Sequence, residues 1–372
     1  MKINKLNLYN FRLFKEFCLE FNEGLNIIFG NNAIGKTTII EAINYLGLTK
    51  SFKTSNDDDI VRNENNEFAV HGIIFNGENT SKLTVSKVGK IKKVSINEKY
   101  VKKISEYLGE FLVVVFSNYD QRSLLANSKD RRKLFEPIIC QISEFYLSYY
   151  NYYNKLLNER NTLLKRLNFE YTDSLMKLIE VIDERFVLYA SKIIQIRKKI
   201  CEEINFVIEE IHYKISDKKE KLSIKYLPSC DAVELSAKLK NALKEDIKKG
   251  STSFGPHRDD YRFIINENDL ISHGSQGQQK NSLVSLKLAF VEIIKKEKNK
   301  YPILLLDDVF GELDKTRQNN LVLAIPDGVQ TIITSSSITE LDNKILDKAN
   351  IINLKELKKY NDNVDNFVKK CW

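Results

Sequence analysis

The stretch IIFGNNAIGKTTII, residues 27–40, limits the possible folds of this 372-residue chain more than any other feature. An apolar run of strand length leads into a loop bounded by two glycines, and an amphipathic helix begins directly after the loop. Residues 30–37 fit the pattern G-x-x-x-x-G-K-[ST], in which backbone N–H groups and the helix N-terminus point at phosphate oxygens. A chance glycine turn is the alternative, but both flanks favour a nucleotide phosphate site.

The positions of this phosphate loop have predicted roles. Lys36 is expected to supply a positive charge to the β and γ phosphates, and the Thr37 hydroxyl to bind Mg²⁺. The glycines allow the backbone to curl so that its N–H groups face the phosphates. The predicted nucleotide-binding residues of the loop and first helical turn are Gly30, Asn31, Asn32, Ala33, Ile34, Gly35, Lys36, Thr37 and Thr38.

Such a site needs an acidic partner for the metal, and PILLLDD, residues 302–308, supplies one. The apolar run predicts a buried strand that ends in two carboxylates, which is a Walker B pattern. Asp307 is predicted to bind Mg²⁺ together with Thr37, and Asp308 to orient the attacking water as a general base. An apolar strand ending in carboxylates is a weak signal alone, but beside a phosphate loop it is strong. The predicted catalytic residues are therefore Lys36, Asp307 and Asp308.

The composition is typical of a globular protein, with 42% hydrophobic and 29% charged residues. No apolar run approaches the roughly 20 residues that span a bilayer, and the N-terminus alternates polar and apolar residues, so we expect a cytoplasmic protein without a membrane partner. The five cysteines form no C-x-x-C pair and the four histidines no H-x-x-x-H spacing, so neither disulfides nor zinc are indicated. The net charge of +8 is too modest to predict nucleic-acid binding by itself.

Strand patterns and helix patterns alternate along the chain in three blocks. Strands are expected over residues 2–11, 17–22, 24–30, 68–75, 81–88, 91–97 and 110–116. Long helical patterns follow over residues 128–215, long enough for two antiparallel helices that form a short arm, and strand patterns return after residue 251. One α/β nucleotide-binding domain with a helical insertion explains this order. The predicted domains are 1–120 and 249–372, which form the two halves of the head, and 121–248, which is the helical arm or lobe.

The stretch SHGSQGQQKNSLVSLKLAF, residues 272–290, indicates what completes the site. Its SQGQQ segment begins an apolar-periodic helix 32 residues before Asp307 and resembles the signature motif of ABC-type ATPases. Gly311-Glu312-Leu313-Asp314 resembles the D-loop of that class. A helix N-terminus rich in small and amide residues is an anion site, although an ordinary helix cap is the alternative. The expected fold class is therefore α/β, an ABC-type P-loop ATPase head with an inserted helical arm or lobe domain.

The ABC resemblance implies that the signature motif acts on a second subunit. Ser275, Gly277 and Gln278, with the helix N-terminus, would bind the γ-phosphate of ATP held by the opposite copy. ATP would then hold together a homodimer. The expected cofactors are ATP and Mg²⁺.

Seven segments in chain order resemble the RecF family of bacterial recombination and repair ATPases. They are GLNIIFGNNAIGKTTIIEAI, KSFKTS, RRKLFEPIICQI, KLLNERNTLLK, SFGPHRDD, SQGQQKNSLVSLKLA and ILLLDDVFGELDKTRQ. The resemblance implies an ATP-driven dimer that clamps double-stranded DNA near single/double-strand junctions. It also implies that the protein helps RecR and RecO load RecA on gaps, and that a weak, slow, DNA-stimulated ATPase resets it.

Several positions depart from the pattern of the RecF family, and the role of one arginine has two interpretations. Ala33-Ile34 replaces the usual glycine-glutamine pair, Asn118-Tyr119 stands where an FSPED-like sequence is expected, and Gly311 replaces a serine. Asp308 in place of glutamate shortens the reach by a methylene, so slow hydrolysis is expected. Arg12 lies where related heads contact nucleotide, and a solvated turn arginine is the alternative.

Other uses of the same head are alternatives. A transporter ATPase subunit would carry a switch histidine after VQTIIT, where this chain has serines. An SMC-like tethering ATPase needs a much longer arm, and a defence-associated type would carry a nuclease module. For DNA phosphates, the lysine-rich residues 87–103 and 242–250 are candidates, although such runs are usually solvated faces.

Overall fold

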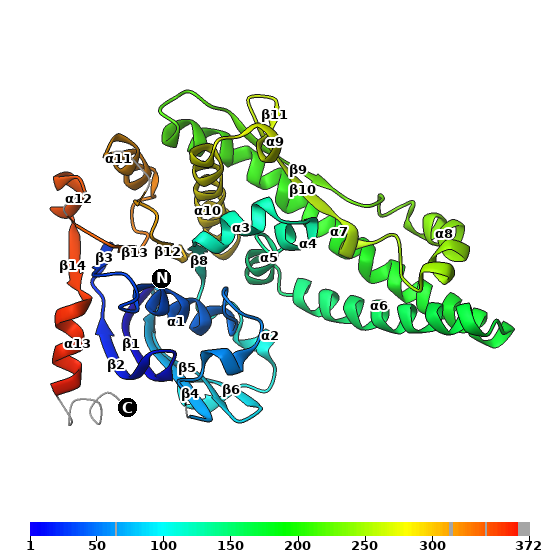
Figure 1. Cartoon of the computed structure of the whole chain (residues 1–372), viewed down its shortest axis with the longest axis horizontal. Coiled ribbons are helices and arrows are strands. Elements are labelled where there is room, and N and C mark those ends of the chain that lie inside the picture. The colour runs from blue at the N-terminus through cyan, green and yellow to red at the C-terminus, as the bar shows by residue number, and fades with distance from the viewer. Residues whose placement is uncertain (64, 312–314, 339–340, 364–372) are drawn as a thin grey trace. The chain divides into compact units, whose positions relative to one another are not determined.

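The computed structural model divides the chain into two compact units, and Figure 1 shows its helices and strands. The structure describes residues 1–63, 65–311, 315–338 and 341–363. The first unit consists of Met1–Arg122, Val207–Lys221 and the chain from Ser275 onward, and the second of Ser123–Phe206 and Leu222–Gly274. None of the helices in the described ranges is long and apolar enough to cross a lipid bilayer.

The compact units differ from the predicted three-part domain division, which stays a prediction. Val207–Lys221 lies within the arm range in the sequence but belongs to the first unit. Residues 249–274 lie within the predicted head range but belong to the second unit. Residues 249–274 join the second unit through strand pairing, because β10 (Asp260–Ile265) pairs with β9 (Leu222–Leu227).

A parallel sheet forms the centre of the first unit, with strand order β14-β3-β13-β12-β8. Its strands are β3 (Leu25–Phe29), β8 (Val113–Phe116), β12 (Ile303–Asp307), β13 (Thr331–Ser335) and β14 (Ala349–Asn353). Every residue of β12 and β13 is buried, as expected for parallel strands that are covered on both faces. The buried apolar runs read from the sequence as strands therefore lie side by side, and their carboxyl ends share one edge.

An antiparallel sheet completes the first unit, with strand order β2-β1-β4-β5-β6-β7. Its strands are β1 (Lys2–Phe11), β2 (Phe14–Glu20), β4 (Glu67–Phe75), β5 (Thr80–Val88), β6 (Ile91–Ile96) and β7 (Lys99–Tyr100). Burial alternates strictly along β4, so one face of this sheet packs on the core and the other faces solvent. Helix α1 (Lys36–Leu48) packs into the same hydrophobic core as both sheets.

Helices α6 (Tyr146–Phe169) and α7 (Asp173–Ile215) confirm the predicted antiparallel helical pair of the arm. Tyr153 contacts Phe186, and Arg160 pairs with Asp183, so later residues of α6 meet earlier residues of α7. The strands β9, β10 and β11 (Asn268–Asp269) and helix α8 (Leu235–Lys249) complete the second unit. The last turns of α7 belong to the first unit.

The remaining elements are short or follow the phosphate-site strands. Early in the chain they are η1 (Asp57–Ile60), α2 (Ile104–Tyr107), α3 (Asn118–Leu125), α4 (Ser128–Arg132) and α5 (Glu136–Ile142). Later they are η2 (Pro256–Arg258), α9 (Leu270–His273), α10 (Gln276–Lys298), α11 (Lys315–Ala324), α12 (Asn343–Leu346) and α13 (Leu354–Asn363).

The GPHRDD segment organises a buried polar network in the second unit. Arg197 has 1% of its surface exposed and donates to Asp259 Oδ2 (3.0 Å), the Pro256 carbonyl (2.8 Å) and Glu136 Oε1 (3.1 Å). His257 Nε2 lies 3.0 Å from the Thr252 carbonyl. A buried arginine needs a partner for each of its donors, so these contacts hold the GPHRDD segment, residues 255–260, against the helix that carries Arg197.

We predict that His257 makes the second unit less stable in mild acid. Burial lowers the pKa of His257 to about 4, below its usual 6.5, because the neutral ring fits the site. The unfolded chain takes up the proton first as the pH falls, so this contribution is complete above pH 6.5 and is lost towards pH 4. Linkage gives a loss of about 2 kcal/mol between pH 7 and 5.

Urea unfolding of the wild type and His257→Gln at pH 7 and pH 5 measures this loss. The variant should show a smaller change in unfolding free energy between the two pH values. An identical change in both proteins would contradict the assignment. The pKa of half-buried His71 is also lowered to about 4, and that of buried His212 is lowered as well, but both lie in the first unit, contribute in both proteins and cancel in the comparison.

Candidate nucleotide-binding site

The phosphate loop lies between the end of β3 and the start of α1, as the sequence predicts. Gly35 precedes the helix with φ 113°, and a Cβ atom there would lie 2.8 Å from the Phe14 ring. Only glycine fits this position without displacing the ring. Asn31, Asn32 and Ala33 are exposed, so the tip of the loop faces solvent.

Ala33 has a left-handed backbone with φ 62°, at a loop position where the sequence resemblance implies a glycine. A non-glycine residue in this conformation costs about 1 kcal/mol. The departure from the family pattern therefore stores a small strain in the loop, while the backbone N–H group remains available.

Lys36 stands at the first position of α1 and reaches back across the loop. Its Nζ donates to the carbonyl oxygens of Gly30 (2.6 Å) and Asn31 (3.1 Å). Burial lowers the pKa of Lys36, and the nearby Asp308 and Asp307 carboxylates act in the opposite direction. The cation is thus held at the mouth of the loop, where a phosphate would accept the same donors.

The predicted metal ligands Thr37 and Asp307 are brought together although they are 270 residues apart. Thr37 Oγ1 donates to Asp307 Oδ1 over 3.0 Å, and Thr334 Oγ1 donates to the same oxygen over 2.7 Å. Burial raises the pKa of Asp307, and the two hydroxyl donors oppose this shift. The buried carboxylate is held in one orientation by two side chains.

The donor set fits Mg²⁺. A hydroxyl and a carboxylate oxygen are hard ligands of the kind that Mg²⁺ prefers, and Mg²⁺ takes its other ligands from phosphates and water. Among the described residues no group of three or more histidine, cysteine, aspartate or glutamate side chains is arranged to hold a metal ion. A cation here would therefore depend on the nucleotide as well as on the protein.

Asp308 adopts a left-handed backbone with φ 53°, and its N–H group donates to Thr334 Oγ1 over 2.9 Å. Aspartate tolerates this conformation better than glutamate, which gives a local reason for the shorter side chain. Asp308 is half-buried, whereas Asp307 is buried. Thr334 thus fixes both acidic residues, and sequence reasoning missed it although it ends the predicted strand VQTIIT.

Ser275 caps α10 through a reciprocal pair of hydrogen bonds with Gln278. The Gln278 N–H donates to Ser275 Oγ over 3.2 Å, and the Ser275 N–H donates to Gln278 Oε1 over 2.8 Å. The capping geometry named as the alternative is therefore present, with Ser275 exposed and Gly277 half-buried. Within the described ranges, no hydrogen bond or ion pair joins Ser275, Gly277 or Gln278 to the phosphate loop. Residues 312–314 of the predicted D-loop lie outside the described residues.

Arg12 forms hydrogen bonds with other residues of the first unit, so it is not a freely solvated turn residue. Its guanidinium donates to both carboxylate oxygens of Glu41 (3.1 and 2.6 Å) and to the Asp59 carbonyl (2.5 Å). The fully buried Glu41 also accepts from Ser51 Oγ (2.5 Å) and pairs with Lys53 (3.2 Å). Sequence reasoning missed this pairing, although the quoted segment KSFKTS contains two of its members. The role of Arg12 towards nucleotide stays a prediction.

Known proteins resemble this chain over nearly its full length. The family model described as "RecF/RecN/SMC N terminal domain" matches residues 2–352. A "DNA replication and repair protein RecF" of Clostridium botulinum is 38% identical over 355 residues, covering 94% of this chain and 96% of the relative. One from Staphylococcus carnosus is 36% identical over 368 residues, covering 96% and 99%. This chain belongs to the RecF family.

Solved structures agree with the RecF assignment. A structure titled as the recombination mediator protein RecF-ATPrS in the RecFOR pathway has a TM-score of 0.83 and 34% identity, covering 92% of this chain and 94% of that one. The corresponding RecF-ATP structure has a TM-score of 0.84 and 33% identity, covering 91% and 93%. An Smc head from Pyrococcus furiosus, 18% identical with a TM-score of 0.51, covers 97% of this chain and 99% of its own and supports the fold alone. The predicted α/β ABC-type head and the RecF resemblance are confirmed, and the transporter alternative receives no support.

Thr334→Val is predicted to destabilise the first unit. The substitution keeps the shape but removes the acceptor for the Asp308 N–H and one of the two hydroxyl donors to Asp307 Oδ1, which keeps only Thr37. The expected loss is about 1–3 kcal/mol of unfolding free energy, measured by urea denaturation. Thr334→Ser is the matched control and should keep most of the stability because it retains the hydroxyl. A valine variant as stable as the wild type would contradict the role given to this hydroxyl.

Proposed function

We propose that this RecF-family chain is an ATP-dependent DNA-binding protein of recombinational repair and replication-fork recovery. The observation that carries the proposal is the meeting of Thr37 and Asp307 beside the phosphate loop. Relatives in the RecFOR pathway whose structures are titled RecF-ATP and RecF-ATPrS support ATP as the nucleotide.

Each residue of the nucleotide site has a separate proposed role in binding or hydrolysing ATP. The loop N–H groups and Lys36 would bind the β and γ phosphates, and Thr37 and Asp307 would hold Mg²⁺. When bound, the metal neutralises charge on the phosphates. Asp308 would orient the attacking water and accept its proton, and its short side chain makes this step slow.

The site is completed by a second copy of the chain. Ser275, Gly277 and Gln278 make no hydrogen bond or ion pair with the phosphate loop of their own chain, within the part that the structure describes. Their exposed helix N-terminus suits a phosphate presented by a partner, because the helix dipole and the N–H groups of a first helical turn favour an anion. ATP would therefore drive homodimer formation, and weak hydrolysis would release it.

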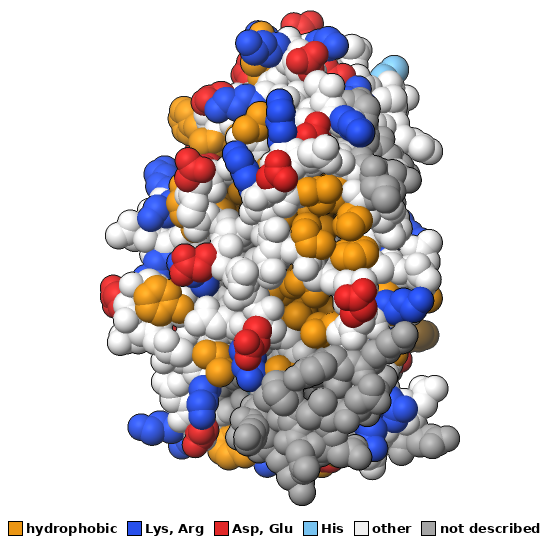
Figure 2. All heavy atoms as spheres, turned by 90° about the vertical axis from the view of Figure 1, so that its left-hand side faces the viewer, with side chains coloured by type: hydrophobic (Ala, Val, Ile, Leu, Met, Phe, Trp, Pro, Cys, Tyr) orange, Lys and Arg blue, Asp and Glu red, His pale blue; other side chains and the backbone are white. Residues whose placement is uncertain are grey.

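The dimer would clamp double-stranded DNA near single/double-strand junctions and help RecR and RecO load RecA on gaps. The lysine-rich residues 87–103 are the candidates for contacts with DNA phosphates. They extend from the end of β5 through β6 and β7 at the edge of the antiparallel sheet. Lysines 90, 93, 99, 102 and 103 are exposed there, with Glu98 as the exposed acid within the run. Figure 2 shows basic, acidic and apolar side chains intermixed on the side where β14 and α13 lie, which gives less reason to place DNA there.

Fluorescence anisotropy of a labelled duplex at about 0.15 M salt tests the clamp, since salt controls such affinities. Affinity should rise with ATP and not with ADP, because only the γ-phosphate engages the second copy. Lys36→Ala and Ser275→Arg should each abolish the gain, one by removing the phosphate contact within the chain and the other by blocking the contact between chains. A DNA affinity that is the same with ATP, with ADP and without nucleotide would overturn the proposed function.

The general-base role of Asp308 predicts a second result. Asp308→Asn keeps the size of the side chain and suits the left-handed backbone, but it cannot accept the proton. ATP hydrolysis should fall about a hundredfold while ATP binding persists, measured by phosphate release and by binding of a fluorescent ATP analogue. Hydrolysis at the wild-type rate in this variant would assign the base to another residue.

A further inference from the structure

A chain of hydrogen bonds links the first turn of α10, the predicted signature helix, to His212 near the end of α7. The roles proposed above for the nucleotide site do not include these contacts. Gln278 Nε2 donates to Glu220 Oε1 over 2.8 Å. The other oxygen of Glu220 lies 3.3 Å from His212 Nε2, and His212 Nδ1 lies 2.9 Å from Ser285 Oγ. All four residues belong to the first unit.

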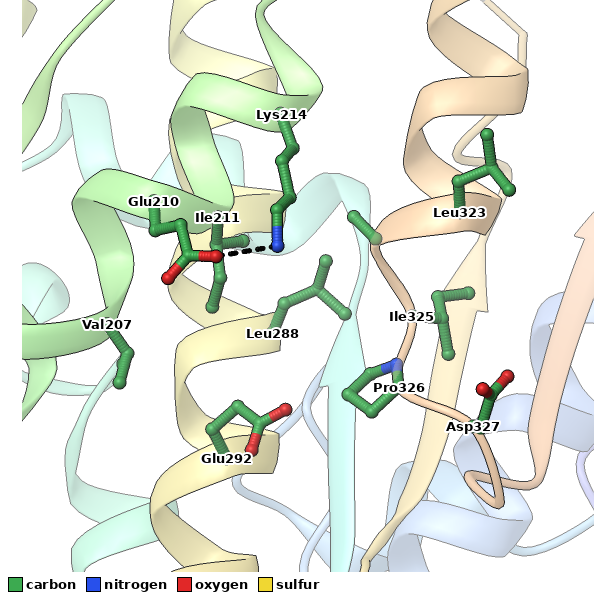
Figure 3. A pocket seen from close by; sticks show the side chains of 11 residues that line it. Val207, Glu210, Ile211, Lys214, Leu288, Glu292, Leu323, Ile325, Pro326 and Asp327 are labelled. Atoms are coloured by element: carbon green, nitrogen blue, oxygen red, sulfur yellow. Dashed lines mark ion pairs between the residues drawn. The ribbon is translucent and has the colours of Figure 1, made fainter.

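The backbone after α7 brings Glu220 into this position. Asp217 and Lys218 have left-handed backbones with φ 56° and 62°, which reverse the chain after the helix. The Glu220 N–H then donates to Ser216 Oγ over 3.3 Å. Figure 3 shows Val207 and Ile211 of α7 beside Leu288 of α10, so the helix that carries His212 lies against the helix that carries Gln278. Glu220 is therefore fixed by the hydrogen bond of its backbone N–H to Ser216 and by the contacts of its carboxylate with Gln278 and His212.

The order Ser285–His212–Glu220 resembles a hydrolytic triad, but it cannot act as one. Ser285 and His212 have no exposed surface, so a substrate has no access to the hydroxyl. Ser285 Oγ also lies 2.8 Å from the Asn281 carbonyl within its own helix. Burial lowers the pKa of His212, which favours a neutral ring that donates from Nε2 to Glu220. Its Nδ1 then faces the Ser285 hydroxyl, whose single proton lies between Nδ1 and the Asn281 carbonyl. The arrangement suits a fixed support for the Glu220 carboxylate.

We propose that Glu220, fixed by His212, is a positioning residue for the ATP contact between two copies. It holds the amide of Gln278, whose other end caps Ser275, and so sets the first turn of α10 for the γ-phosphate of a partner. This inference rests on the proposed function. Loss of the carboxylate should loosen the signature turn and weaken ATP-driven dimerisation, while ATP binding to the phosphate loop of the same chain stays unchanged.

The hydrogen-bond chemistry predicts which substitution restores the contact. In Glu220→Gln the amide oxygen can still accept from Gln278. The amide N–H₂ would then face His212 Nε2, and the imidazole can shift its proton to Nδ1 and donate to Ser285, whose hydroxyl donates to Asn281. Every partner is satisfied again. Glu220→Ala leaves Gln278 and His212 without this partner.

Two measurements on full-length variants test the proposal. Binding of a fluorescent ATP analogue to dilute protein reports the contacts within one chain, and sedimentation velocity with ATP reports dimerisation. Glu220→Ala should weaken dimerisation about tenfold with analogue affinity within about twofold of the wild type, and Glu220→Gln should restore it. Glu210→Ala is the matched control, because it breaks an exposed ion pair with Lys214 on the same helix and should change neither readout.

His212→Phe keeps a buried ring and removes the donor to Glu220, so it tests the relay if the alanine variant fails to fold. It should weaken dimerisation several-fold while analogue affinity stays within about twofold of the wild type, and a His212→Phe variant that dimerises like the wild type would overturn the proposal. The proposal is overturned if Glu220→Ala dimerises like the wild type, if analogue binding and dimerisation fall together, or if Glu210→Ala causes the same loss. A wild type that does not dimerise with ATP would instead contradict the proposed function itself.

Discussion

The buried carboxylate of Asp307 is the contact on which the nucleotide site depends. One of its oxygens accepts from Thr37, at the start of α1, and from Thr334, at the end of the neighbouring strand β13. Three segments that are far apart in sequence are thereby joined at the carboxyl edge of the parallel sheet. A buried carboxylate is costly unless its lone pairs are used, so the two hydroxyls stabilise the fold and orient the side chain that we propose as a metal ligand.

The signature helix is fixed by a second set of buried polar contacts. Lys287, in the middle of α10, forms a buried ion pair with Asp120 over 2.6 Å. At its first turn, Gln278 binds Glu220, and Glu220 is supported by His212. Because buried charges and amides need specific partners, these contacts leave α10 little freedom to rotate or slide. A rigid helix with an exposed N-terminus is what a contact between two copies requires.

The sequence predicted the parts of the site that are coded by local pattern. The phosphate loop carries its own glycines and flanks, and PILLLDD shows the buried strand and the acidic residues together. The capping geometry of Ser275 was also visible, since serine followed by glutamine three residues later is a known helix start. These features need no information from elsewhere in the chain.

The parts that sequence reasoning missed are pairings over long sequence distances. Nothing in the sequence distinguishes Thr334 from other threonines, because its contact with Asp307 depends on the pairing of β13 with β12. Glu41 likewise resembles any helix residue in the sequence, because its partners Arg12 and Lys53 come from other segments. Glu220 lies in a polar turn whose geometry depends on two left-handed residues. The place of Val207–Lys221 in the first unit was not visible in the sequence either, because the end of α7 continues the helical pattern that precedes it.

We propose that the phosphate loop of one copy and the signature helix α10 of another form one ATP site. Mixing the Lys36→Ala and Ser275→Arg variants, each of which should be inactive alone, tests it by ATP hydrolysis. A mixed dimer would contain one intact site, so random pairing in equal amounts should restore about a quarter of the wild-type rate. A mixture as inactive as its components would contradict a site shared between two copies.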